Sequence, residues 1–131
     1  MKIIEAYPPN IEKIRQVIVP PHGTVFAYGE SIYNPDKIKI YPDLYLHEET
    51  HQKQQKEFGN TELWWDKYLL DRDFREIMEV QAYSNQLKFL KEEIPNHAIK
   101  ELLFEMSEHL SRNYELGISV MQAHTKIRKS N

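Results

Sequence analysis

The chain has 131 residues, a formal net charge of −3 and no cysteine. This length suits one domain with a real core, so we expect residues 1–131 to form a single domain. The slight acidity gives no electrostatic reason to expect a nucleic-acid partner. The lack of cysteine excludes disulfides, thiolate metal ligands and a cysteine nucleophile.

Targeting segments are not visible in the sequence. No stretch approaches the roughly 20 apolar residues that a membrane-spanning helix needs. Glu5 and the pair Pro8-Pro9 interrupt the first residues before an apolar run of signal length can form. We therefore expect no membrane partner and a cytoplasmic location, which the absence of cysteine also favours. Nothing in the sequence indicates an oligomeric state.

The first forty residues favour short strands and one short helix. Residues 2–7 suit a strand or extended arm, and Asn10 can cap a short helix that follows it. Residues 24–28 and 31–33 predict a pair of strands, and the polar–apolar alternation of residues 37–41 predicts another. The fold class expected is α+β, mainly helical, with a small antiparallel sheet preceding the next helix. An open edge of that sheet could bind a peptide backbone, or the strands could simply cover the helix.

Next along the chain comes His47-Glu48-Glu49-Thr50-His51, which has the pattern H-E-x-x-H. On a helix His47 and His51 are one turn apart, so both imidazoles project from one face and can bind a single zinc ion. Glu48 lies about 100° around the helix, beside the ion without replacing a ligand. There it can take a proton from a zinc-bound water that attacks a carbonyl. The pattern therefore predicts a zinc peptidase; the alternative is a charged helix face with two unrelated histidines.

The surrounding residues favour the helix that this reading requires. Pro42 suits the first helical position, and Gly59 follows the last one. Leu44 and Phe58 share a stripe with the two histidines, which predicts that both imidazoles face the protein.

A zinc peptidase of this type needs a third protein ligand, which leaves the fourth position for water. The extended pattern H-E-x-x-H-x-x-G-x-x-H is absent, because Gln54 and Glu57 occupy the positions of its glycine and third histidine. The third ligand must therefore come from further along the chain.

A later helix, predicted from about Phe74 to Lys91, carries the two candidates Glu76 and Glu79. Glu76 falls near the middle of the apolar stripe and Glu79 on its shoulder. A carboxylate that faces the core needs a partner, so at least one of the two should be paired or metal-bound. Periodicity leaves the choice open, with a slight preference for Glu76, and either residue could instead form a salt bridge.

The motif at residues 47–51, followed on a later helix by E-V-Q-A-Y at residues 79–83, resembles the gluzincin class of zinc metallopeptidases, particularly its small single-domain members. In that class the third ligand is a glutamate often followed by x-x-Ala, which implies Glu79 as ligand and Glu48 as general base. One departure matters. Where the class often has an acidic residue that orients a ligand histidine, this chain has Tyr83. Tyr83 could orient a ligand, donate to the developing oxyanion, or be a core aromatic.

The resemblance covers residues 24–90, and the remaining helices look like scaffold. Asn96 can cap one of them, and the capping-box pattern at residues 119–122 predicts the start of the last. His109 is expected to be a surface or packing residue and not a ligand.

The function that these patterns predict is a zinc-dependent metallopeptidase acting on a peptide or protein substrate. His47, His51 and Glu79 would hold Zn2+, and Glu48 would activate the zinc-bound water. An alternative is a catalytically inactive, peptidase-like binding or structural module. A third hypothesis is a helical interaction protein in which the motif is a coincidence.

Overall fold

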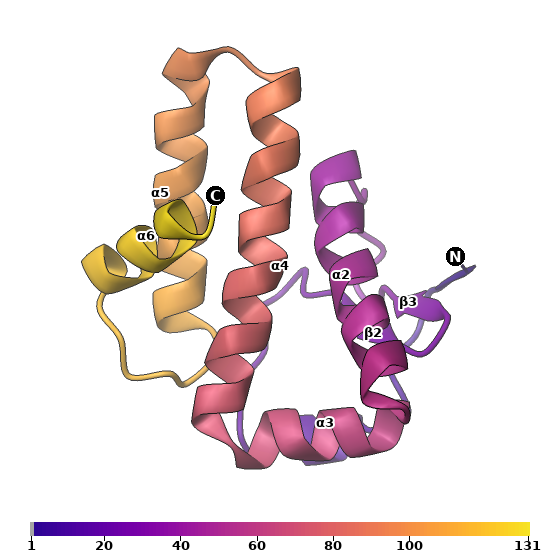
Figure 1. The fold of residues 1–131 in the computed structure, drawn as a ribbon. Helices are drawn as coiled ribbons and strands as arrows, with labels where there is room; N and C mark the ends of the chain where they lie inside the picture. Colours follow the sequence, from indigo (N-terminus) through magenta and orange to yellow (C-terminus); the bar gives the residue numbers. More distant parts are fainter. Residues whose placement is uncertain (1) are drawn as a thin grey trace.

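The computed structural model of the protein describes residues 2–131. Most of this chain is helical, and the strands precede the long helices, which confirms the predicted α+β class (Figure 1). In chain order the elements are β1 (Lys2–Ile4), α1 (Ile11–Arg15), β2 (Phe26–Tyr28), β3 (Ser31–Tyr33), α2 (Pro42–Phe58), α3 (Thr61–Leu70), α4 (Arg72–Glu93), α5 (Asn96–Arg112) and α6 (Val120–Lys129).

The predicted sheet is present, but it is mixed and not purely antiparallel. Its strand order is β1-β3-β2. β2 and β3 form an antiparallel hairpin in which Phe26 lies opposite Tyr33. β1 joins the far side of β3 in parallel, with Lys2 opposite Ser31. A parallel arrangement is possible because β1 is separated from the hairpin by a long connection that contains α1, and a tight turn could not provide it.

Residues 37–41 do not form the predicted strand. The side chain of Asn34 satisfies the backbone that a neighbouring strand would otherwise pair: its Nδ2 donates to Ile38 O at 2.8 Å, and Ile38 N–H donates to its Oδ1 at 3.1 Å. Lys37 also has a φ of 55°, which breaks an extended run. The polar–apolar alternation of residues 37–41 therefore predicted a half-buried segment correctly, but the segment does not pair with a strand as expected.

The helix ends follow mostly local signals. α2 starts at Pro42 and ends before Gly59, whose φ of 95° is in the left-handed region that favours glycine. The side chains of Asn60 and Asp71 accept hydrogen bonds from the first turns of α3 and α4. The predicted capping box at residues 119–122 is confirmed.

Two predicted caps are wrong in detail. α5 begins at Asn96 itself, so Pro95 takes the cap position. Asn10 precedes α1 as expected, but its side chain makes no capping hydrogen bond.

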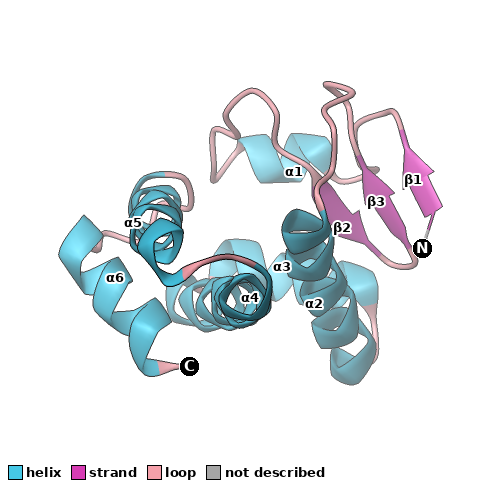
Figure 2. Cartoon of the chain, turned by 90° about the horizontal axis from the view of Figure 1, so that it is seen from above, coloured by secondary structure: helices cyan, strands magenta, loops and turns pink. Residues whose placement is uncertain are grey.

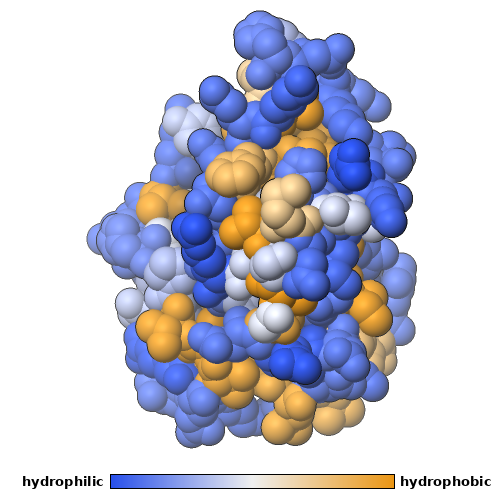
Figure 3. All heavy atoms as spheres, turned by 90° about the vertical axis from the view of Figure 1, so that its left-hand side faces the viewer, coloured by the Kyte–Doolittle hydropathy of each residue, from blue (hydrophilic) through white to orange (hydrophobic). Residues whose placement is uncertain are grey.

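The long helices stand side by side, and α4 lies between α2 and α5 (Figure 1). α3 runs across the end of this layer and links α2 to α4, while α6 packs on α5 and α4. Seen from above, the sheet and α1 lie on the α2 side, and α6 lies on the opposite side (Figure 2). On the face where α5 and α6 lie, hydrophilic residues predominate and hydrophobic ones show between them (Figure 3). None of the helices within residues 2–131 combines the length and apolar character needed to cross a membrane.

The hydrophobic residues form two core clusters. One joins α1, β2 and α3 through residues that include Ile14, Phe26 and Trp64. The other joins α4, α5 and α6 through residues that include Leu87 and Leu110. Within residues 2–131, neither cluster includes a residue of α2.

Candidate metal centre

The buried face of α2 is polar. Its buried residues are His47, Glu48, Thr50, His51, Gln54 and Gln55. A helix in a globular protein usually buries an apolar stripe, and a buried polar side chain destabilises the fold unless it has a partner. α2 is therefore built around specific polar contacts. The predicted inward direction of the two histidines is confirmed, whereas Phe58 on the same predicted stripe is exposed.

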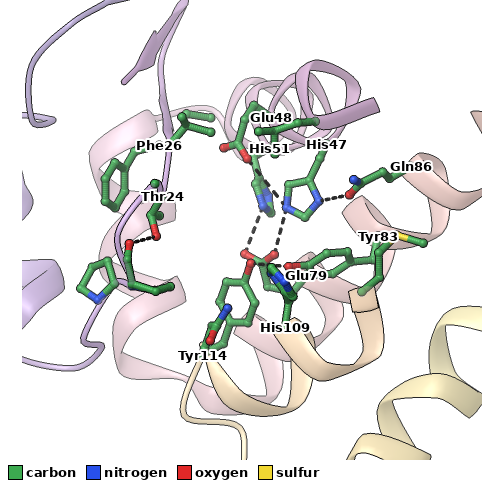
Figure 4. A pocket seen from close by; sticks show the side chains of 18 of the residues that line it. Thr24, Phe26, His47, Glu48, His51, Glu79, Tyr83, Gln86, His109 and Tyr114 are labelled. Carbon is green, nitrogen blue, oxygen red and sulfur yellow. Dashed lines mark hydrogen bonds and ion pairs between the residues drawn. The ribbon is translucent and has the colours of Figure 1, made fainter. Parts of the chain in front are cut away.

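Glu79 of α4 lies opposite the two histidines of α2 (Figure 4). Its Oε1 is 3.2 Å from His47 Nε2, and its Oε2 is 3.1 Å from His51 Nε2. All three side chains are buried, and their candidate ligand atoms lie within 4.8 Å of one another. The structure thus brings together the two histidines of the motif and the glutamate that the resemblance implied.

Glu76, the alternative that periodicity slightly favoured, points elsewhere. Its carboxylate is 2.8 Å from Lys126 Nζ of α6, in a partly buried ion pair. α4 is covered on more than one side, by α2 and by α6. Its apolar stripe therefore does not reveal which carboxylate faces α2. Glu57, the position of the third histidine in the longer motif, is exposed.

A glutamine orients His47. His47 Nδ1 is 3.0 Å from Gln86 Oε1. The amide of Gln86 is held the right way round because its Nε2 donates to Asp43 Oδ2 at 2.8 Å. Gln86 therefore presents an acceptor, and His47 Nδ1 must carry the proton.

A second glutamine does the same for His51. His51 Nδ1 is 2.8 Å from Gln54 Oε1. Gln54 Nε2 donates to Met78 O at 3.1 Å and to Gln81 Oε1 at 2.7 Å, which again fixes the amide orientation. Both imidazoles thus donate through Nδ1 and turn Nε2 toward Glu79.

This arrangement calls for a positive charge between the rings and the carboxylate. A neutral imidazole that donates through Nδ1 has a lone pair on Nε2, which the oxygens of Glu79 would repel at these distances. Glu79 Oε1 is buried and accepts no hydrogen bond, although His47 Nε2 is close to it. Either additional protons on the rings or a cation would resolve the contact. Two imidazole nitrogens and a carboxylate are a ligand set typical of zinc, so the residues present fit that ion.

The electrostatics of the pair agree with this interpretation. Burial alone would lower the pKa of His51, but the charge of Glu79 and hydrogen bonding to it raise that pKa to about 9. Burial alone would raise the pKa of Glu79, but His51 and His47 lower it below the usual range of a carboxyl group. Without a cation the site therefore keeps a proton on His51.

Glu48 lies beside the three candidate ligands and not among them. Its side chain is buried, and its Oε2 is 3.8 Å from His47 Nε2. Burial, helped by the charge of Glu79, raises the pKa of Glu48, while the two histidines and a hydrogen bond from the backbone N–H of Ala27 act in the opposite direction. This is the position that the motif predicts for a general base.

Two tyrosines that the sequence did not reveal complete the site. The hydroxyl of Tyr68 in α3 donates to Glu79 Oε2 at 2.5 Å. The hydroxyl of Tyr114, which follows α5, lies 2.7 Å from that of Tyr83. The ring centroids of Tyr83 and His47 are 4.5 Å apart, so Tyr83 is a buried aromatic packed against a candidate ligand. Tyr68 sits on the buried face of α3, where a hydroxyl needs a partner, but no local pattern could have pointed to Tyr114.

The site opens into a cavity of about 450 Å³. Ile14, Ile18 and Phe26 contribute to one apolar wall, and Leu102 and Met106 of α5 to another. Its lining is thus mainly apolar around a polar centre, as in many small-molecule and substrate sites.

His109, also on α5, lines the cavity from an exposed position (Figure 4). It does not belong to the group of candidate metal ligands, as the sequence predicted.

No protein-family model matches the chain, and the searches of curated proteins and of solved structures found no match. The protein is therefore described by its fold and its candidate site alone. It is an α+β chain with a buried group of two histidines and a glutamate that could hold a metal ion.

Proposed function

We propose that the protein is a zinc-dependent metallopeptidase. The observation that supports this most directly is the pair of imidazoles whose Nδ1 atoms are engaged by Gln86 and Gln54, so that both Nε2 atoms face the carboxylate of Glu79. His47, His51 and Glu79 would hold the ion and leave one coordination position open.

When bound, zinc would polarise the scissile carbonyl and lower the pKa of the attacking water. Glu48 takes the proton of that water and then passes it to the leaving nitrogen. Burial favours this role, since it raises the pKa of Glu48 toward the pH at which a general base works best.

A peptide substrate would reach this centre along the outer edge of β2. At Ala27 that edge is occupied, because Ala27 O accepts hydrogen bonds from Gln55 Nε2 at 2.8 Å and from Trp65 Nε1 at 3.1 Å. Val25 directly precedes β2, outside the paired residues of the sheet. Val25 also lines the cavity. An extended peptide would pair with the backbone at Val25 and place an apolar side chain against the apolar walls.

Replacing Glu48 tests this proposal. We expect Glu48→Gln to bind one zinc per chain while peptide cleavage falls by about 100- to 10,000-fold, the usual contribution of a general base. The matched control is Glu49→Gln, because Glu49 pairs with the exposed Lys53 at 3.9 Å and its replacement should leave the rate unchanged. Zinc content is measured by elemental analysis and cleavage with a peptide library.

Two results would contradict the proposal. Loss of zinc together with activity would show that Glu48 is not acting as a base beside an intact centre. A wild-type protein that carries zinc and binds peptides but releases them uncut would instead be the inactive binding module.

A further inference from the structure

Arg75 of α4 is a buried cation without an acidic partner. Its side chain is 4% exposed. None of the ion pairs in residues 2–131 involves it, and its hydrogen bonds all go to backbone carbonyls. Burying a guanidinium group in this way is unfavourable unless its donors are satisfied, so the carbonyls that it binds are informative.

Two of these carbonyls belong to the last turn of α3, which Arg75 caps. Arg75 Nη1 donates to Tyr68 O at 2.9 Å and to Leu69 O at 3.1 Å. These carbonyls lie in the last turn of α3, where intrahelical partners are missing and the helix dipole favours a cation.

The other two carbonyls belong to Tyr114 and Glu115, in the segment that follows α5. Arg75 Nε donates to Tyr114 O at 2.8 Å, and Nη2 donates to Glu115 O at 3.2 Å. Glu115 has a φ of 54°, an unfavourable conformation for a residue other than glycine. The guanidinium group therefore holds a strained bend directly after Tyr114.

Both tyrosines whose carbonyls Arg75 binds reach the candidate metal centre. Tyr68 donates to Glu79, and Tyr114 contacts Tyr83, whose ring packs on His47. Arg75 precedes Glu79 by one helical turn, so α4 carries both the carboxylate and the group that fixes its surroundings.

We propose that Arg75 is a positioning residue of the metal centre. By holding the backbone of Tyr68 it places the Tyr68 hydroxyl against Glu79. By holding the backbone of Tyr114 it places that hydroxyl against Tyr83, whose ring packs on His47. This role rests on the proposed function, since it requires that the centre bind zinc. If Arg75 only linked the two backbone segments, its replacement would change the stability of the fold without a specific effect on zinc binding.

The test is the zinc dissociation constant, measured by competition with a chromophoric chelator. We expect Tyr68→Phe and Arg75→Lys each to weaken zinc binding by about 10- to 100-fold, as is usual for partners of metal ligands. The double variant should lose less affinity than the two single effects combined, because both changes act partly through the hydrogen bond from Tyr68 to Glu79. The control is Arg72→Lys, which changes an exposed arginine at the start of the same helix and should leave zinc binding unchanged.

The possible results separate this role from the proposed function. If the wild-type protein does not bind zinc, both fail. If it binds zinc but Tyr68→Phe or a folded Arg75→Lys binds equally well, or if the two effects simply add, only the positioning role is wrong. Should Arg75→Lys not fold, Tyr68→Phe and Tyr114→Phe decide the matter, and both must weaken zinc binding.

Discussion

At the scale of single residues, the candidate centre is defined by what orients the histidines. Both imidazoles are held by neutral glutamine amides, Gln86 and Gln54, and not by carboxylates. An amide fixes the ring and its tautomer without adding negative charge next to Glu79 and Glu48. The two rings are therefore oriented without any negative charge beyond that of Glu79 and Glu48.

Most of the site residues could be predicted from the sequence, because H-E-x-x-H has a geometric meaning on a helix. His47, His51 and Glu48 lie where the motif places them, and Glu79, which the resemblance implied, lies beside both histidines. Gln54 was noted only as a departure from the longer motif, yet it is the partner of His51. Such a partner cannot be identified locally, because its role depends on Met78 and Gln81 of another helix.

The pairing of His51 with Glu79 predicts how the metal-free protein responds to pH. The pKa of His51 is raised from 6.5 to about 9, so the folded protein keeps a proton that the unfolded chain releases. This contribution to stability is complete below pH 6.5 and is lost as the pH rises through about 9. The free energy of unfolding of chelator-treated protein, measured in urea, should therefore fall across that interval. His51→Gln should remove most of this dependence, and a wild-type stability that rises over the same interval would contradict the pairing.

At the scale of elements, the sequence predicted helices better than strands. Local devices such as Pro42, Asn60, Asp71 and the capping box at residues 119–122 set helix ends, and each can be recognised without the rest of the fold. Strand pairing depends on distant partners. The segment 37–41 alternates like a strand but is satisfied by a side chain instead.

The end of α2 gives a prediction at this scale. Gly59 has a φ of 95°, and an added Cβ would meet no atom within 4 Å. Gly59→Ala should therefore destabilise the protein through backbone strain alone, by about 1 to 2 kcal/mol. Lys53→Ala, at an exposed position of the same helix, should change stability by less than about 0.5 kcal/mol. Denaturant unfolding measures both, and an unchanged midpoint for Gly59→Ala would show that α2 does not end as described.

At the scale of the whole molecule, the candidate centre lies where the two core clusters meet. Tyr68 belongs to the cluster of α1, β2 and α3, Tyr83 belongs to the cluster of α4, α5 and α6, and Tyr114 packs against both. The helices after α4 looked like scaffold in the sequence, but they deliver Tyr114 to the site. No local pattern predicts this, because it arises only when the segment after α5 returns to Arg75.

The most direct measurement is an anomalous-scattering map of crystals grown with zinc, collected on both sides of the zinc absorption edge. We predict one strong peak per chain, at coordination distance from His47 Nε2, His51 Nε2 and a carboxylate oxygen of Glu79. A map without a peak between these three side chains, or a zinc ion bound only elsewhere, would contradict the account.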